Sequence, residues 1–160
     1  MSEPQQKAGH YQHVFVAVDL AVDNQRVMDR AMALRDEQTR VSLVHVIEPA
    51  YFYYGLAPGY QIGMPSSVIE ADEDQEAAMI RRAQGQFDQL GEVWNVAAEN
   101  RHLERGHAAN KILTLAERLD VDLIVVGSHG RHGLQLLLGS TASAVLHRAN
   151  TDVLAVRVYD

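Results

Sequence analysis

The chain contains no cysteine. This absence excludes disulfides, zinc–thiolate sites, iron–sulfur clusters and cysteine nucleophiles, and it agrees with a reducing compartment, so we expect a cytoplasmic protein. Long hydrophobic runs are also missing, because apolar runs such as Leu123–Val126 and Leu136–Leu138 are far shorter than the roughly 20 residues of a membrane helix. Residues 1–12 are polar and have no hydrophobic centre, which predicts a flexible N-terminal tail without a secretory signal.

Basic residues are few. Lysine and arginine number 14 against 21 aspartates and glutamates, which gives a formal charge of -7. A surface of this charge repels long polyanions, so we expect no nucleic-acid binding. The 160 residues are 47% hydrophobic, which suffices for one core without metal or disulfide cross-links. We therefore expect one domain over residues 13–160, after the tail.

Strand and helix patterns alternate along the chain. Five runs favour strands, of which the third is polar and predicted to be exposed: 13–19, 41–47, 100–105, 121–126 and 153–158. Apolar stripes predict helices over 23–37, from 67 to about 94, around 109–119 and around 142–149. Such alternation predicts an α/β fold with a mainly parallel sheet covered on both faces. Ligands of such sheets bind beyond the carboxyl ends of the strands, which points to Asp19, Ile47 and the segment after Val126.

A glycine-rich segment follows the fourth predicted strand. It begins Gly127-Ser128-His129-Gly130-Arg131-His132-Gly133 and ends with Gly139-Ser140-Thr141 at the start of a helix. Glycines allow close approach of a ligand to the backbone, and the free N–H groups of a helix start attract anions. A tight strand-to-helix turn with ordinary caps explains the same pattern. The segment lacks the Gly-Lys-Ser/Thr triplet of a P-loop and the G-x-G-x-x-G dinucleotide fingerprint.

Motifs spread over most of the chain resemble the universal stress protein (UspA) family. They are VAVD (Val16–Asp19), LVHV (Leu43–Val46), DLIVVGSHG (Asp122–Gly130), LLLGS (Leu136–Ser140) and VLAVR (Val153–Arg157). The resemblance implies an open five-stranded parallel sheet of the Rossmann-like, adenine nucleotide alpha hydrolase-like type. It also implies a stress-response or regulatory module that forms a homodimer through the C-terminal strand, and, in one branch, an adenine nucleotide (ATP or AMP) beyond the sheet edge.

The nucleotide site that this resemblance implies comprises Val18, Asp19, Val46, Gly127, Ser128, His129, Gly130, Arg131, Gly139, Ser140 and Thr141. Asp19 would accept hydrogen bonds from the adenine amino group or a ribose hydroxyl, or else cap the turn that follows it. Val46 would pack against the purine, or else belong to the core. The chain keeps the signature glycines Gly127, Gly130 and Gly139, so we expect it to bind an adenine nucleotide. Two departures from the signature favour the branch without nucleotide. Only eight residues separate Gly130 from Gly139, one fewer than in the nucleotide signature, and Leu20-Ala21 replaces the usual Gly-Ser.

Patterns of catalysis are missing. The sequence has no G-x-S-x-G elbow and no HExxH, so we expect neither an enzyme nor a metal site. Two alternatives stay open. One is a nucleotide-free dimeric adaptor that engages a protein partner through the aromatic loop around Tyr51–Tyr60 and the C-terminal strand. The other is a slow ATP hydrolase or self-phosphorylating protein with Ser140 or Thr141 as acceptor. The apolar edge strand Val153–Val158 favours a homodimer, because such an edge is normally paired or covered.

Overall fold

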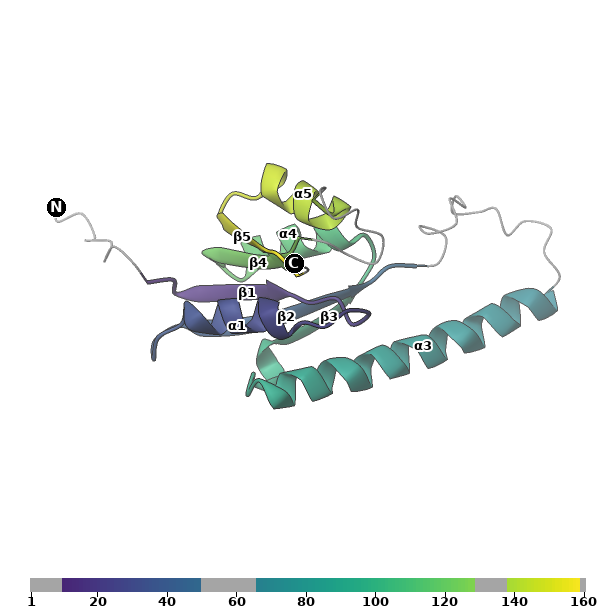
Figure 1. The fold of residues 1–160 in the computed structure, drawn as a ribbon. Coiled ribbons are helices and arrows are strands. Elements are labelled where there is room, and N and C mark those ends of the chain that lie inside the picture. Colours follow the sequence, from purple (N-terminus) through teal and green to yellow (C-terminus); the bar gives the residue numbers. More distant parts are fainter. Residues whose placement is uncertain (1–9, 50–65, 129–137, 159–160) are drawn as a thin grey trace.

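The computed structural model describes residues 10–49, 66–128 and 138–158, with the backbone alone described over 66–73. Within these residues five strands form one parallel sheet (Figure 1). The strands are β1 (His13–Ala17), β2 (Arg40–Ile47), β3 (Arg101–Arg105), β4 (Leu123–Gly127) and β5 (Asp152–Val156). Their spatial order is β3-β2-β1-β4-β5. Strands β2 and β3 therefore lie on one side of β1, and β4 and β5 lie on the other. The winding reverses between β1 and β4, which opens a crevice at their carboxyl ends.

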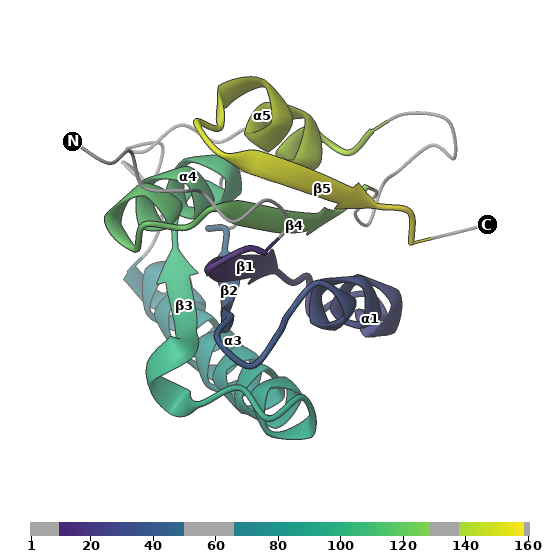
Figure 2. The same cartoon turned by 90° about the vertical axis from the view of Figure 1, so that its left-hand side faces the viewer.

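Helices cover both faces of the sheet (Figure 2). They are α1 (Gln25–Ala33), α3 (Ser66–Val93), α4 (Ala108–Arg118) and α5 (Ser140–Arg148), with a short 3-10 turn at Ala98–Asn100. On one face, Met28 of α1 and Phe87 of α3 are completely buried against Val16 and its neighbours. On the other, Ile112 of α4 and Val145 of α5 pack around Phe15. The alternation of β1 side chains between these two cores follows from the twofold period of a strand.

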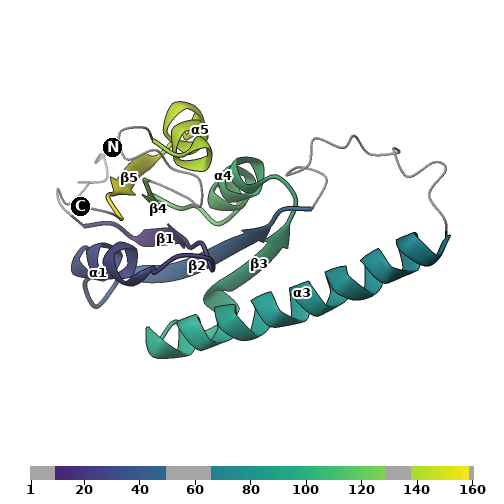
Figure 3. The same ribbon diagram turned by 45° about the vertical axis from the view of Figure 1, so that its right-hand side comes forward.

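Helix α3 is 28 residues long and begins beyond the carboxyl edge of the sheet (Figures 1 and 3). It runs back along β2 and β3, against which it packs. Its end is defined by Asn95, which takes a left-handed φ of 53°, while the N–H of Val96 donates to the carbonyl of Gly91 at 2.9 Å. Helix α4 ends in the same manner at Asp120. Short polar side chains tolerate this conformation, and the motif satisfies carbonyls that a helix end leaves free.

The amino ends of the strands are fastened by side chains. The Asp122 carboxylate accepts the N–H groups of Gln12 and His13, at 2.7 and 2.8 Å, and the Tyr11 hydroxyl donates to Asp152 at 3.0 Å. The His13 ring lies between the Leu119 carbonyl and the Ser42 hydroxyl. Burial there lowers the pKa of His13 below its usual value. Residues 10–12, part of the predicted tail, thus contact the body of the domain, whereas residues 1–9 lie outside the described residues.

The α/β fold with its five-stranded parallel sheet is confirmed, while several local expectations differ from the structure. The first strand ends at Ala17 rather than at residue 19, and the fourth spans 123–127 rather than 121–126. The first helix spans 25–33 rather than 23–37, because Asp23 forms the turn before it, accepting the N–H of Gln25 at 2.8 Å. The strand expected to be exposed, β3, is half-buried over its first four residues, since α3 covers it and Leu103 packs against the core.

Candidate functional site

A pocket of about 760 Å³ opens at the carboxyl ends of β1, β2 and β4. This volume lies within the range of small-molecule sites. Its walls come from the β1–α1 turn, the end of β2, one side of α3 and the first turns of α4 and α5. The described lining residues are Ala17, Val18, Asp19, Leu20, Ala21, Val22, Asn24, Val27, Val44, His45, Val46, Ile47, Glu48, Met79, Arg82, Ala83, Gln86, Ala108, Ile112, Val126, Gly127, Leu138, Gly139, Ser140, Thr141, Ala142 and Val158.

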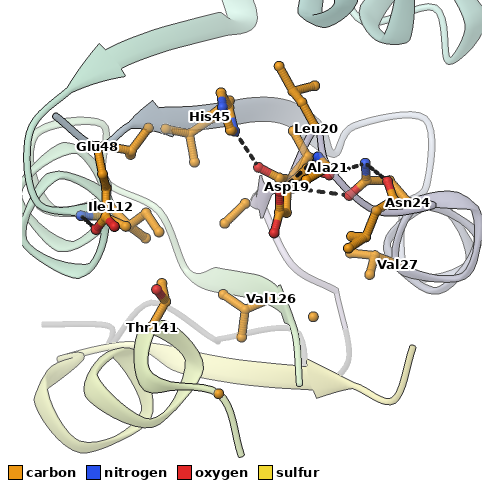
Figure 4. Close-up of a pocket in the computed structure, with 18 of the residues that line it drawn as sticks. Asp19, Leu20, Ala21, Asn24, Val27, His45, Glu48, Ile112, Val126 and Thr141 are labelled. Atoms are coloured by element: carbon orange, nitrogen blue, oxygen red, sulfur yellow. Dashed lines mark hydrogen bonds between the residues drawn. The ribbon is translucent and has the colours of Figure 1, made fainter. Parts of the chain in front are cut away.

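The β1–α1 turn is held rigid by Asn24 (Figure 4). The Asn24 side-chain oxygen accepts the Asp19 N–H at 3.2 Å, and its amide nitrogen donates to the carbonyls of Asp19 and Val22, at 2.8 and 3.1 Å. One carboxylate oxygen of Asp19 accepts the Ala21 N–H at 2.9 Å, which is the turn-capping role expected for this residue. Because Asp19 also lines the pocket, capping does not exclude a contact with a ligand.

His45 forms the part of the wall next to Asp19. Its Nδ1 lies 2.8 Å from the carbonyl oxygen of Val18, and its ring contacts that of Phe87 with 6.4 Å between centroids. A carbonyl oxygen only accepts hydrogen bonds, so Nδ1 is the donor in this bond. The side chain therefore joins β1, β2 and α3 at the pocket.

The first turn of α4 is capped from outside the helix. Glu48, just after β2, accepts the Ala108 N–H through Oε1 at 2.9 Å, across 60 residues of sequence. His107 accepts the Asn110 N–H through Nδ1 at 3.4 Å. Two of the N–H groups that a helix start leaves unsatisfied are therefore occupied by side chains.

The first turn of α5 differs from that of α4. Its N-cap is Gly139, and no side chain caps the helix among the described residues. The Gly139 N–H donates to the Ser128 carbonyl at 2.6 Å, which fixes the entry to the helix beside β4. Ser140 and Thr141 follow, and both line the pocket. Backbone N–H groups of an uncapped first turn, together with the helix dipole, favour an anion.

The structure brings most of the predicted site residues together. Seven of them line the pocket: Val18, Asp19, Val46, Gly127, Gly139, Ser140 and Thr141. Ser128 is buried beside the pocket without lining it, and its N–H donates to the Val156 carbonyl at 2.7 Å. His129, Gly130 and Arg131 lie outside the described residues, as do Tyr51–Tyr60 of the aromatic loop. A contact of any of these residues with a nucleotide stays a prediction.

Sequence reasoning missed several lining residues. Glu48 follows a predicted strand end, so the rule that pointed to Asp19 was sufficient to find it. Asn24 carried a weaker signal, an amide side chain in a predicted strand-to-helix turn. No sequence signal pointed to the part of the wall that α3 forms, because its position depends on the angle at which the helix crosses the sheet. Its residues are Met79, Arg82, Ala83 and Gln86.

Two further classes of site were searched for in the described parts of the chain. No group of three or more histidine, aspartate or glutamate side chains there is arranged to hold a metal ion. None of the helices in those parts has both the length and the apolar composition needed to cross a membrane.

Comparisons with known proteins agree with this architecture. Two proteins of Coxiella burnetii are similar over nearly their full length: universal stress protein A homolog 1 is 40% identical over 149 residues, covering 92% of this chain and 96% of that protein. Universal stress protein A homolog 2 is 36% identical over 151 residues, covering 93% and 97%.

Solved structures share the fold. The hypothetical protein MJ0577 superposes with a TM-score of 0.74 at 22% identity, covering 94% of this chain and 98% of that one. A universal stress protein in complex with cAMP superposes with a TM-score of 0.55 at 23% identity, covering 94% and 99%. The model of the universal stress protein family matches residues 10–157. With that match over most of its length, the chain belongs to the universal stress protein family.

Proposed function

We propose that the protein is a dimeric regulatory module that binds an adenine nucleotide, ATP or AMP, in this pocket without catalysing a reaction on it. The observation that carries the proposal is the start of α5, which no side chain of the described residues caps and which faces the same pocket as Asp19. The N–H groups at the start of α5 can bind a phosphate chain, and the Asp19 carboxylate can accept hydrogen bonds from a nucleoside. The cAMP complex of a relative supports this choice of ligand class. The lack of cysteine supports a cytoplasmic location.

A nucleotide bound to the folded state alone should raise the melting temperature. At a hundredfold excess over Kd the stabilisation is about 2.7 kcal/mol, which for a domain of this size corresponds to roughly 5–10 °C. The measurement is a thermal melt with increasing ATP or AMP at constant ionic strength. Equal curves with and without millimolar nucleotide would refute the proposal.

Ser140→Glu tests where the phosphates bind. Ser140 is exposed in the first turn of α5, where a carboxylate stabilises the helix through its dipole. The apo protein should therefore melt no lower than the wild type, while the shift caused by ATP disappears, because the new charge repels phosphate. Ser140→Gln, of similar size without charge, should keep most of the shift. Transfer of labelled γ-phosphate to the protein would instead favour the self-phosphorylation alternative.

The homodimer is proposed to form through β5. This strand lies at one edge of the sheet, and its residues 153–155 are half-buried in the single chain. The Val156 carbonyl accepts from Ser128 and so points inward, toward the β4 side. The N–H and C=O of one residue point to the same side of a strand, and successive residues point to opposite sides, so the Ala155 N–H points outward, to the free edge.

Ala155→Pro should therefore remove an edge donor without breaking a bond to β4, and proline is tolerated in edge strands. The variant should sediment as a folded monomer at concentrations where the wild type is a dimer. Ala155→Ser, which keeps the N–H, should remain dimeric. A dimeric Ala155→Pro protein in sedimentation velocity would place the interface elsewhere.

A further inference from the structure

The two helix starts at the pocket are electrostatically opposite. At α4 the Glu48 carboxylate occupies the position that an anion would take, since Oε1 accepts the Ala108 N–H at 2.9 Å. At α5 no described side chain does so. A phosphate at the start of α4 would meet the Glu48 carboxylate, whereas at the start of α5 it would meet N–H groups that no side chain in the described parts of the chain accepts. Glu48 therefore imposes a direction on any nucleotide, with its phosphates at α5 and its nucleoside toward β2.

The second carboxylate oxygen of Glu48, Oε2, has no hydrogen-bond or ion-pair partner in the parts of the chain that the structure describes. Glu48 is half-buried and lines the pocket. The bond from Ala108 fixes the carboxylate in place. Figure 4 shows Glu48 beside Ile112 on the α4 side of the pocket, with Thr141 on the α5 side and Asp19 on the β1 side. An ionised carboxylate accepts hydrogen bonds but donates none.

We propose that Glu48 is a specificity-determining residue, whose free oxygen accepts a hydrogen bond from an N–H or O–H donor of the bound nucleoside. This inference rests on the proposed nucleotide binding and deepens it. Two groups of an adenine nucleotide supply such a donor, the 6-amino group of the base and the ribose hydroxyls. A carbonyl oxygen or a phosphate at the same place is repelled, because a buried acceptor facing another acceptor leaves both unsatisfied.

Glu48→Gln reverses the polarity of this group while keeping its shape. The amide oxygen takes over the bond from Ala108, because the amide nitrogen cannot accept, and the NH₂ group then faces the pocket as a donor. We expect the affinity for AMP to fall about tenfold or more in isothermal titration calorimetry. Glu104→Gln is the matched control, since Glu104 belongs to β3, lies outside the pocket lining and undergoes the same change of charge.

Three ligands distinguish the two donors. If the 6-amino group binds Glu48, Glu48→Gln abolishes the preference for AMP over IMP, whose 6-carbonyl accepts from the new NH₂ group. If a ribose hydroxyl binds Glu48 instead, Glu48→Gln lowers the affinity for IMP as much as for AMP, and it leaves the affinity for 2′,3′-dideoxy-AMP unchanged. Either result supports the inference. An equal effect of Glu48→Gln on all three ligands, or none, overturns it while nucleotide binding stands. A wild-type protein that binds neither these three ligands nor ATP overturns the proposed function, and the role of Glu48 with it.

Discussion

Phe15→Ala is expected to lower the free energy of unfolding by about 3–5 kcal/mol, the usual cost of deleting a buried aromatic side chain. Phe15 lies in β1, the central strand, and is completely buried. It pairs in register with Ser42 of β2 and Ile124 of β4, so the backbone around it is fixed on both sides. The α4 and α5 side chains that pack on it cannot close the resulting cavity without leaving their own contacts.

Equilibrium unfolding in urea, at one protein concentration for all variants, measures this loss. Phe15→Leu is the control, because it keeps most of the volume and should cost less than about 1.5 kcal/mol. The His102 ring, 6.2 Å from that of Phe15 in an edge-on contact, loses its partner in both variants, so their difference isolates the cavity. An alanine variant no less stable than the leucine variant would contradict the packing described.

Two glycines of α3 should respond in opposite directions to alanine. At Gly91 a Cβ atom would overlap Nε and Cδ of Arg101. That side chain cannot move freely, because its Nε donates to the Val96 carbonyl at 2.8 Å and its NH2 nitrogen lies 3.0 Å from Glu92. Displacing it removes a hydrogen bond from a charged group, and about 2 kcal/mol of stability is expected to be lost. At Gly85 nothing lies within 4 Å of the added carbon.

Gly85→Ala should therefore raise the free energy of unfolding by up to about 1 kcal/mol, from the higher helix propensity of alanine. Both variants are compared with the wild type in the same urea titration. Because the substitution and the helix are the same, the difference between them reports the Arg101 contact alone. A stabilising Gly91→Ala would show that Arg101 rearranges without loss.

Most of the sheet could be predicted because β1, β2, β4 and β5 contain β-branched residues and helical stripes separate the strands along the chain, whereas the polar β3 follows only from the alternation. Val14–Ala17 and Leu123–Val126 leave little choice of element, and alternation then dictates parallel pairing. Element ends were less predictable. They depend on single hydrogen bonds, such as that from Gln25 to Asp23, which compete with helix propensity on nearly equal terms.

For the site, the sequence predicted Asp19 at a strand end and Gly139 at a helix start, but it missed Glu48 and the residues that α3 contributes. Asp19 and Gly139 line the pocket because the sheet places them there, and their contact with a nucleotide remains to be tested. Arg82 carries no local pattern that separates it from any solvated arginine of a surface helix. Its place in the pocket wall results from the packing of Phe87, one and a half turns further on, against β2.

The hydrogen bond between Glu48 and Ala108 also has a consequence for how the fold tolerates change. Together with the bond from the Gly106 N–H to the Ile47 carbonyl, at 3.0 Å, it ties the two ends of the long α3 excursion to each other. A change in the length of α3 leaves the groups that form these two bonds unchanged. The start of α4 therefore keeps its place beside the end of β2, whatever the length of the helix that precedes it.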